Sequence, residues 1–286
     1  MSRIAFVNGA FLPFEEARVP ITDRGFLFAD GIYEVSAVLN GRLVDNEAHL
    51  ARLDRSLSEI RMANPYPASE WARLEEELVR RNGIIEGLVY MQVTRGAAER
   101  DFSFPPDAEP TVVMFTQAKT ITRSPQAEAG VAVVTTPDLR WKRRDIKSVA
   151  LLAQVLAKQA ATDAGVFEAW MVEDGFVTEG SSSTAFIVTT AGRIVTRPLS
   201  RAVLPGITRG AVTRLASERG LEVDERPFSV EEAHAAAEAF LTSASSFVMP
   251  VVALDGRPIG TGTPGPQTRR LRQLYLEMAA AAADVG

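Results

Sequence analysis

The sequence has no cysteine and only two histidines, His49 and His234. Without cysteine there is no disulfide, no thiol nucleophile and no thiolate metal ligand, and two imidazoles alone argue against a metal enzyme. Excess positive charge is also lacking, since the net charge of -5 gives no electrostatic reason to bind nucleic acid. No charge-free apolar run is long enough to span a bilayer. We therefore expect a cytoplasmic protein that binds neither nucleic acid nor a membrane.

What is present is ordinary globular composition. Hydrophobic residues make up 46% and charged residues 23% of a 286-residue chain, which is too apolar for a disordered protein. This length can build one large domain or two moderate ones. We expect two, with a linker at residues 119–129.

Residues 1–118 are predicted to form a small N-terminal α/β domain. Asn-Gly turns in "IAFVNGAF" and "VSAVLNGRLV" favour hairpins, because alternating apolar residues flank them. The apolar spacing predicts helices over 47–62 and 69–83, followed by strands over 88–96 and 111–117. Strands packed with a pair of helices indicate an α+β arrangement.

Residues 130–286 are predicted to form a larger domain rich in antiparallel strands. Its expected strands are 130–136, a hairpin over 169–180 around Asp174-Gly175, and 183–190. Helices are expected after Lys147, from Ile207, and after Ser229, which has capping-box spacing to Glu232. A strand, an "LDGRPIG" hairpin and a helix from about Pro266 close the chain.

The stretch "KRRDIKSVALLAQVLAKQAA" contains the first candidate catalytic residue, Lys147. A lysine attacks a carbonyl only as the neutral amine, so its pKa must be lowered by burial or by nearby cations. Arg143 and Arg144 lie just upstream, and the apolar run from Val149 suggests burial downstream. The alternative is a solvated charge on the flank of a helix.

Three further stretches carry polar groups suited to binding. In "FVTEGSSSTAF" the carboxylate Glu179 ends a strand, the alternative being a polar turn with Glu179 at its rim. In "LPGITRG" a glycine turn leads into a helix whose first backbone amides, at Ile207 and Thr208, suit a phosphate group. The alternative is a simple helix start that binds no ligand. In "LTSASSFVMP" three serines interrupt an apolar strand.

Together these motifs resemble the fold-type-IV pyridoxal-phosphate enzymes. The matching pattern is a lysine, then "TEGSSS", "GITR" and a serine-rich turn before "PVVALDG". The additional stretches "DRGFLFADGIYE" and "VTRGAAERDFSFP" are similar to D-amino acid aminotransferases, alongside branched-chain aminotransferases and aminodeoxychorismate lyases. The resemblance covers nearly the whole chain.

The resemblance implies pyridoxal 5′-phosphate as cofactor and assigns residues to it. Lys147 would form the Schiff base and move the proton, and Glu179 would keep the pyridine nitrogen protonated so that the ring withdraws electrons. The other cofactor contacts that it implies are Arg52, Leu204, Ile207, Thr208, Ala244 and Ser245. At Ala244 the family usually has a threonine.

The resemblance also implies a substrate site. Tyr33, Arg100 and Phe102 match the family's tyrosine, arginine and histidine that hold the substrate carboxylate, so the histidine is missing here. Ser182 and Ser183 would also contact substrate. The alternatives are a core aromatic for Tyr33 and a surface cation for Arg100, in which case Arg140 or Arg144 approaches the carboxylate.

The resulting hypothesis is amino transfer from a D-amino acid such as D-alanine to 2-oxoglutarate. The alternatives are a branched-chain L-amino acid or (R)-amine transaminase, a lyase that needs no oxo-acid acceptor, and, least favoured, a non-catalytic module that binds pyridoxal phosphate. Family members complete each active site with residues of the partner subunit, so the resemblance also implies a homodimer.

Overall fold

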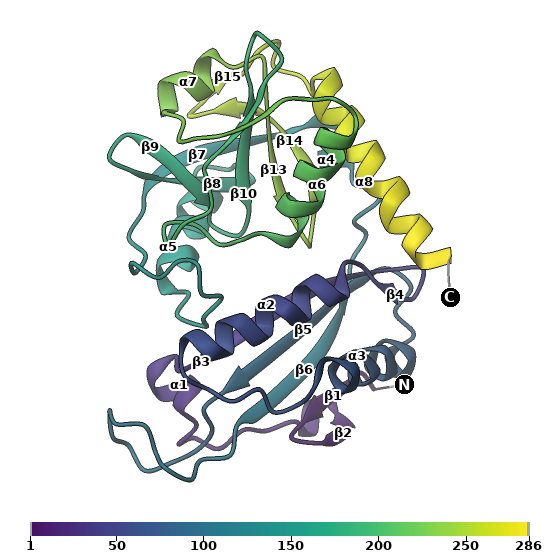
Figure 1. Ribbon diagram of the computed structural model, residues 1–286, viewed down its shortest axis with the longest axis vertical. Coiled ribbons are helices and arrows are strands. Elements are labelled where there is room, and N and C mark those ends of the chain that lie inside the picture. The colour runs from purple at the N-terminus through teal and green to yellow at the C-terminus, as the bar shows by residue number, and fades with distance from the viewer. Residues whose placement is uncertain (1, 285–286) are drawn as a thin grey trace. The chain divides into compact units, whose positions relative to one another are not determined.

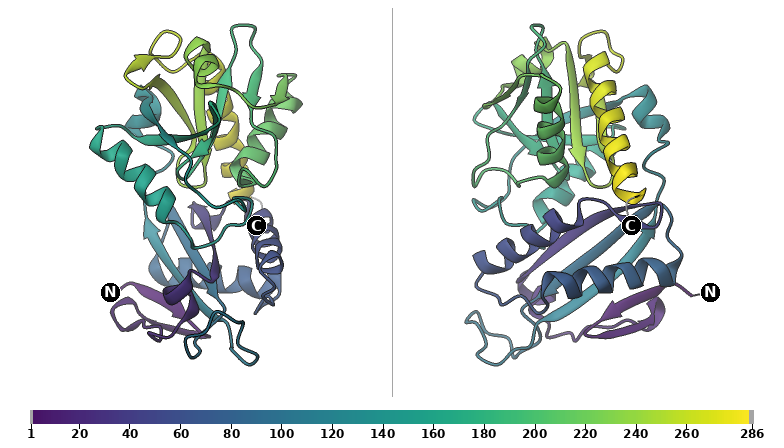
Figure 2. Two further views of the ribbon diagram at one scale, coloured as in Figure 1. Left: turned by 90° about the vertical axis from the view of Figure 1, so that its left-hand side faces the viewer. Right: turned by 45° about the vertical axis from the view of Figure 1, so that its right-hand side comes forward.

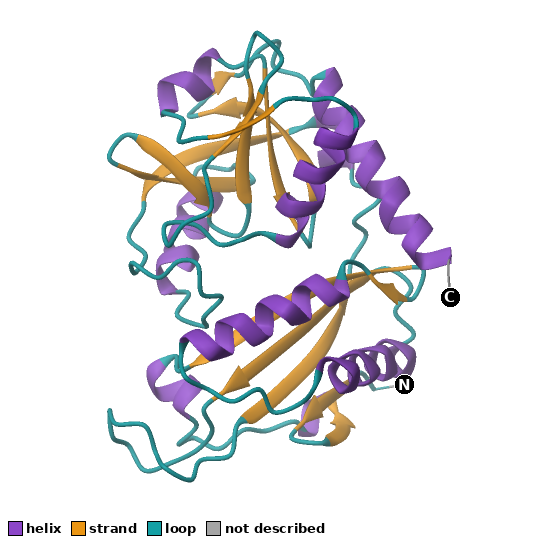
Figure 3. Cartoon of the chain, in the orientation of Figure 1, coloured by secondary structure: helices purple, strands orange, loops and turns teal. Residues whose placement is uncertain are grey.

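The computed structural model describes residues 2–284, which divide into two compact units. The described part of the first unit is residues 2–120, 146–150 and 279–284, and the second consists of Ile121–Asp145 and Leu151–Met278. Both combine helices with strands (Figure 3), so the predicted α+β class is confirmed. The domain bounds expected from the sequence, 1–118 and 130–286 with a linker at 119–129, stay a prediction.

The first unit is built on a six-stranded antiparallel sheet with the order β2-β1-β6-β5-β3-β4. Both predicted hairpins are confirmed, and their Asn-Gly turns have positive φ at both residues. The strands are β1 (Ile4–Val7), β2 (Ala10–Pro13), β3 (Gly31–Leu39), β4 (Arg42–Leu43), β5 (Gly87–Thr94) and β6 (Thr111–Ala118).

Two long helices cover one face of this sheet (Figures 1 and 2). They are α2 (Asn46–Glu59) and α3 (Ala68–Asn82), and a shorter α1 (Arg24–Phe28) precedes β3. Their apolar stripes pack on β1, β3, β5 and β6 around Trp71, which is fully buried and donates from its indole nitrogen to Asn64 at 2.8 Å. The helix periods read from the sequence are therefore confirmed.

The second unit contains a nine-stranded mixed sheet with the order β12-β11-β10-β13-β14-β7-β8-β9, in which β15 pairs with β14. Most neighbours are antiparallel, but β7 is parallel to both β14 and β8, and β11 is parallel to β12. The strands are β7 (Val131–Pro137), β8 (Glu168–Glu173), β9 (Phe176–Gly180), β10 (Thr184–Val188), β11 (Ile194–Thr196), β12 (Val223–Glu225), β13 (Glu238–Ser243), β14 (Phe247–Leu254) and β15 (Arg257–Pro258).

Most helices of the second unit begin near the positions expected from the sequence. The helices are α4 (Pro125–Ala129), α5 (Leu152–Asp163), α6 (Ile207–Glu218), α7 (Val230–Ala235) and α8 (Pro266–Asp284), of which residues 279–284 belong to the first unit. The capping box at Ser229 is confirmed, because its hydroxyl accepts from the amide of Glu232 while the Glu232 carboxylate accepts from the amide of Ser229. A buried cluster around Trp170, Phe228 and Leu241 forms the core.

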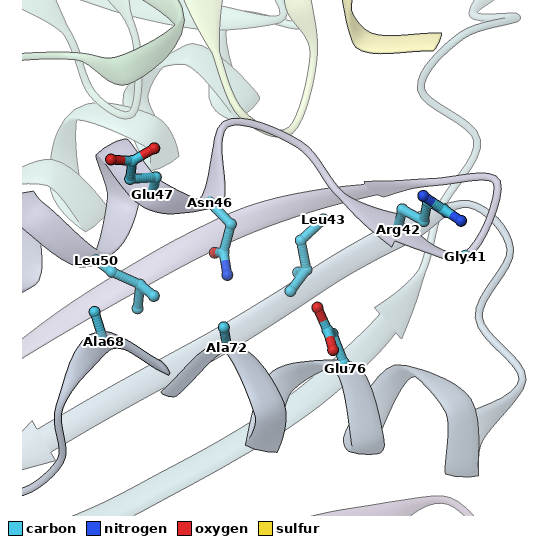
Figure 4. A pocket seen from close by; sticks show the side chains of 9 residues that line it. All are labelled: Gly41, Arg42, Leu43, Asn46, Glu47, Leu50, Ala68, Ala72 and Glu76. Carbon is cyan, nitrogen blue, oxygen red and sulfur yellow. The ribbon is translucent and has the colours of Figure 1, made fainter. Parts of the chain in front are cut away.

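A groove of about 670 Å³ lies in the first unit, between α2, α3 and the β3–β4 turn. Figure 4 shows Asn46 and Leu43 pointing from one side toward Ala72 and Glu76 of α3. None of the residues that line it is among those expected to bind cofactor or substrate. The groove is therefore separate from the residues of the expected active site.

Behind this groove a carboxyl group is buried in the helix layer. Glu75 of α3 accepts a hydrogen bond from the side-chain amide of Asn46 at 2.8 Å, and the carbonyl oxygen of that amide accepts from Ser36 at 3.2 Å. Burial raises the pKa of Glu75 to about 8, an effect that the Asn46 hydrogen bond opposes and the charges of Glu34 and Glu76 reinforce. Glu75 therefore holds its proton in the folded protein near neutral pH.

We expect this proton to make stability depend on pH. Because the folded pKa lies above the ordinary value of 4.5, the stabilisation is complete below about pH 4.5 and is lost as pH rises through about 8. One bound proton changes the free energy of unfolding by about 1.4 kcal/mol per pH unit across that window. Glu75→Gln should flatten the slope and make the protein more stable than wild type at pH 9, measured by denaturant unfolding at pH 5, 7 and 9.

The matched control is Glu77→Gln on the same helix. Glu77 is half-buried and pairs with Arg80 and Arg81, whose hydrogen bonds lower its pKa to about 2. Its contribution is lost only as pH falls below about 4.5, so this variant should keep the wild-type slope between pH 5 and 9. Parallel curves for wild type and Glu75→Gln would contradict the assignment.

Candidate active site

Lys147 is positioned in the first unit by backbone pairing with the start of β3. The amide of Tyr33 donates to the carbonyl of Lys147 at 3.0 Å, and the amide of Val149 donates to the carbonyl of Gly31 at 3.0 Å. Ile32 and Ser148 form a bridge between these bonds. The Lys147 amine then lies 4.1 Å from the centre of the Tyr33 ring, a cation–π distance. The half-buried Tyr33 stacks on Tyr90 at 5.7 Å.

The sequence-based reasons for an activated lysine are wrong in two respects. The apolar run after Lys147 is only partly buried in the single chain, since Ala157 and Ala161 are buried but Leu152 is 73% exposed and Val155 and Leu156 of α5 are also exposed. The upstream cations are not free to act on the amine, because Arg143 pairs with Asp145 at 3.0 Å and Arg144 with Glu173 at 2.8 Å. The setting of Lys147 comes from β3 and its neighbours instead.

A buried ionic cluster lies on the helix face of β3. Arg52 of α2 makes a two-pronged pair with Glu34, at 2.7 and 2.8 Å, and Nδ1 of His49 lies 2.9 Å from the same carboxylate. Burial would raise the pKa of Glu34, but Arg52 and His49 together hold it well below its usual range. Burial, together with the charges of Arg52 and Lys147, outweighs the raising effect of Glu34 and lowers the pKa of His49.

Arg52, expected to contact phosphate, is thus held in a fixed orientation by a carboxylate that the sequence did not single out. Glu34 follows Tyr33 in an otherwise apolar strand, and a charged residue at a core-facing position is the signal that was available. Because Glu34 already fixes the orientation of the Arg52 guanidinium, binding a phosphate there would cost little further side-chain entropy.

Glu179 is buried in the second unit, at 4% exposure near the end of β9. The alternative of a carboxylate at the rim of a polar turn is therefore wrong. The amide of Leu204 donates to both carboxylate oxygens at 3.2 Å, and the guanidinium of Arg140 forms an ion pair with the same group. Burial raises the pKa of Glu179, although Arg140 and the Leu204 amide act in the opposite direction.

The two arginines named as alternative anchors for a substrate carboxylate already have buried carboxylate partners. Arg140 pairs with Asp138 at 2.7 Å as well as with Glu179, and Arg144 lies 3.3 Å from Asp138. The sequence did not single out Asp138, which comes directly after β7. Its side chain is fully buried.

The serine turn after Glu179 is folded tightly around a second carboxylate. The amide of Gly180 donates to the carbonyl of Ser183 at 2.7 Å, and a Cβ at Gly180 would lie 2.1 Å from the Ser183 hydroxyl, so any larger residue would force Ser183 to shift. The hydroxyls of Ser182 and Ser183 donate to Glu168 at 3.0 and 3.3 Å, and that of Ser181 also donates to it. A substrate contact of Ser182 and Ser183 stays a prediction.

The start of α6 fits a phosphate group. Its N-cap is Gly206, which supplies no side chain to cap the helix, so the first amides, including those of Ile207 and the buried Thr208, remain for a ligand. A Cβ at Gly206 would lie 2.8 Å from the Thr184 hydroxyl of β10. Thr242, opposite Thr184 in β13, has a buried hydroxyl without a partner among the described residues.

The serine-rich turn between β13 and β14 is held by hydrogen bonds within the turn and by hydrogen bonds from α8. Ser243 shares hydrogen bonds with Ser245 at 3.3 Å and Ser246 at 2.7 Å, and Ala244 is half-buried between them. Arg272 of α8 donates to the carbonyls of Ser246 at 3.1 Å and Val248 at 2.8 Å. The turn is thus rigid, which suits a site for a charged group.

Arg100 and Phe102 lie in the loop after β5 and are both exposed, Phe102 by 79%. The Arg100 guanidinium lies 5.3 Å from the centre of the Phe28 ring and 5.6 Å from that of Phe102. Arg24 fixes this loop through the carbonyl of Asp101 at 2.6 Å. These two residues therefore face solvent in the single chain.

Residues 2–284 contain no grouping of three or more histidine or acidic side chains suited to a metal ion. No helix in that span is both long enough and apolar enough to cross a membrane.

Residues 31–254 match the family model of the class IV amino-transferases. The chain is 42% identical over 269 residues to a D-alanine aminotransferase of Staphylococcus aureus strain MSSA476, covering 94% of this chain and 95% of that protein. It is 39% identical to a D-alanine aminotransferase of Bacillus licheniformis, covering 93% of each. A branched-chain amino acid aminotransferase of T.th., solved with pyridoxamine 5′-phosphate, superposes with a TM-score of 0.91 at 28% identity, covering 98% of this chain and 94% of that one.

The chain therefore belongs to the class IV amino-transferase family. The enzyme class and cofactor expected from its motifs, a pyridoxal-phosphate-dependent aminotransferase of the fold-type-IV group, are confirmed.

Proposed function

We propose that this enzyme transfers the amino group of a D-amino acid, with D-alanine as the model donor, to 2-oxoglutarate. The observation that carries the proposal is the 42% identity over nearly the whole chain to a D-alanine aminotransferase. Buried Glu179 and the Lys147 segment supply the acidic partner and the amine that this chemistry requires. Bound pyridoxal phosphate supplies a conjugated ring that accepts electrons from the substrate Cα.

Two residues would act at the reacting atoms. Lys147 would hold the cofactor through its amine and would move the proton to and from the substrate Cα, and its backbone is fixed against β3. Glu179 would keep the ring nitrogen protonated, because a buried carboxylate stabilises a positive charge more strongly than a neutral group does.

The remaining cofactor contacts would bind the phosphate and the ring. The amides at the start of α6, at Ile207 and Thr208, and the turn containing Ala244 and Ser245 accommodate phosphate oxygens. Arg52 adds a positive charge whose orientation Glu34 fixes. The Leu204 side chain would pack on the ring, and its amide donates to Glu179.

The substrate carboxylate would be held across a homodimer. Arg100 and Phe102 are exposed in the single chain, as are Ile21 and Phe26 of the same unit, and such apolar exposure favours a partner surface. We propose that Arg100 and Phe102 act in the partner's active site beside that subunit's tyrosine at position 33. A cytoplasmic location stays a prediction of the sequence.

A panel of D- and L-amino acids, each with and without 2-oxoglutarate, tests the function. D-alanine should be consumed only when the acceptor is present, with pyruvate and D-glutamate as products. Preference for L-leucine or L-valine would mean a branched-chain enzyme, and turnover of aminodeoxychorismate without an acceptor would mean a lyase. The panel should include an (R)-amine, since apolar Phe102 offers no hydrogen bond to a carboxylate.

We expect Arg100→Ala to lower kcat/KM for D-alanine by at least about a hundredfold, or roughly 2.7 kcal/mol of transition-state binding. With Phe102 in place of a hydrogen-bond donor, the two-pronged bond from Arg100 is the main charged anchor. An (R)-amine without a carboxylate should lose little. Equal, small losses on both substrates would show that Arg100 is not the anchor.

Mixing subunits tests whether Arg100 acts across the dimer. A dimer of one Arg100→Ala chain and one Lys147→Ala chain has one intact site if Arg100 serves the partner, and none if it serves its own chain. Co-refolding the two inactive variants should therefore restore activity. Refolding either variant alone is the control.

A further inference from the structure

Glu179 is one end of a buried row of alternating charges. The guanidinium of Arg140 lies between two carboxylates, pairing through Nη1 with Glu179 and through Nε and Nη2 with Asp138 at 3.0 and 2.7 Å. The side chains of Asp138, Arg140 and Glu179 are 0%, 5% and 6% exposed. Because water hardly screens them, each charge strongly affects its neighbours.

Asp138 is fixed by three neighbouring segments of the sheet. Its amide donates to the carbonyl of Val172 in β8 at 2.9 Å, and its carboxylate accepts from the Thr178 hydroxyl of β9 at 2.6 Å. Its position at the end of β7 follows from the parallel pairing of β7 with β8. The carboxylate is thus part of the sheet framework and cannot easily turn away from Arg140.

The other cations near Asp138 are paired mainly with a different carboxylate. Arg144 approaches Asp138 at 3.3 Å but makes its two shorter bonds, at 2.8 and 3.0 Å, with Glu173 of β8. Lys142, which also contacts Glu173, is 86% exposed at its side chain and is screened by water. The pair of Arg144 and Glu173 is neutral, so the balance at Glu179 depends on Asp138 and Arg140.

The net charge of Asp138, Arg140 and Glu179 determines how strongly Glu179 can attract a proton on a facing nitrogen. Arg140 and Glu179 alone would form a neutral pair, and a neutral pair attracts a proton on a facing nitrogen only weakly. Adding Asp138 gives the three side chains a net charge of -1. Arg140 meanwhile opposes the rise in the pKa of Glu179 that burial causes.

We propose that Asp138 is a positioning residue for the transamination site, whose negative charge offsets Arg140 so that Glu179 can keep the cofactor ring nitrogen protonated. The proposal rests on the proposed function, in which Glu179 faces that nitrogen. Asp138 itself touches neither substrate nor cofactor in this scheme and acts through Arg140.

The experiment is ¹⁵N NMR of protein reconstituted with pyridoxal phosphate labelled at the ring nitrogen, because the shift of that nitrogen reports its protonation directly. Asp138→Asn keeps the size of the side chain and its hydrogen-bond acceptor but removes the charge. The pH at which the ring loses its proton should fall by about one to three units in this variant. The matched control is Thr178→Val, which removes a hydrogen bond to Asp138 and leaves its charge in place.

The double variant Asp138→Asn/Arg140→Gln separates charge from structure. With both charges gone, Glu179 again carries the net charge of -1 alone, so the ring should regain its proton at neutral pH. If Asp138→Asn alone is unstable or fails to bind cofactor, the double variant still decides, since a protonated ring there supports the proposal and a neutral ring overturns it.

A wild-type pH profile in Asp138→Asn would overturn the proposal while leaving the proposed function intact. A ring that is neutral in both the single and the double variant would overturn it too, since that result means a structural role. A neutral ring in the wild-type protein would contradict the role of Glu179 and the inference together.

Discussion

Replacing Lys147 with alanine is expected to lower transamination by more than about a thousandfold, because both the covalent bond to the cofactor and the proton transfer at Cα would be lost. The variant should stay folded, since the contacts that hold residue 147 against β3 are made by its backbone. The measurement is turnover of D-alanine with 2-oxoglutarate, together with circular dichroism as a check of the fold.

Borohydride reduction identifies the reactive lysine independently of activity. The sequence offers only Lys119, Lys142 and Lys158 as competitors, so peptide mapping gives a clear answer. Lys158→Ala is a suitable control, because this exposed side chain on α5 contacts only Phe167 among the described residues. Its amine donates to the Phe167 carbonyl and lies over the Phe167 ring. An adduct on any lysine other than Lys147 would disprove the assignment.

Glu179→Gln should slow the chemical step by about a hundred- to a thousandfold, the usual cost of removing one preorganised electrostatic group. Glutamine keeps the shape and can still accept from the Leu204 amide, but it cannot hold a proton on a facing nitrogen by charge. A single-turnover measurement isolates this step from product release.

The control for Glu179→Gln is Asp174→Asn, at the tip of the same β8–β9 hairpin. Asp174 has a φ of +53° in that turn, a conformation that asparagine accepts readily, so the hairpin should be unchanged. If Glu179→Gln kept most of its single-turnover rate, another residue would have to support electron withdrawal by the ring.

Much of the fold could be predicted because the relevant signals are local. The two Asn-Gly hairpins, the Asp174-Gly175 turn and the capping box at Ser229 each depend on residues within a few positions of one another. The same holds for the start of α6 after Gly206. Turn and cap chemistry is specified by such short stretches, so sequence alone suffices.

The pairings around the candidate site could not be predicted, since they join residues far apart in the chain. Arg140 reaches Glu179 only because β7, β8 and β9 are neighbours, and the three serines meet Glu168 for the same reason. The apolar run of α5 misled in the opposite way. Its apolar composition indicated burial, yet Leu152, Val155 and Leu156 are exposed in the single chain. Composition alone does not show which apolar side chains of a helix face the core.

The short segment Ile146–Ala150 has a consequence for any attempt to divide this protein. Near Gly31 and Tyr33, β3 is paired with β5 on one side, whereas β4 reaches only Val38 and Leu39 on the other. The segment that carries Lys147 pairs with the edge left open. A fragment ending at residue 120 would leave that edge unprotected, and unpaired edges recruit further strands and promote aggregation. The same five residues would therefore serve both the proposed active site and the protection of this sheet edge.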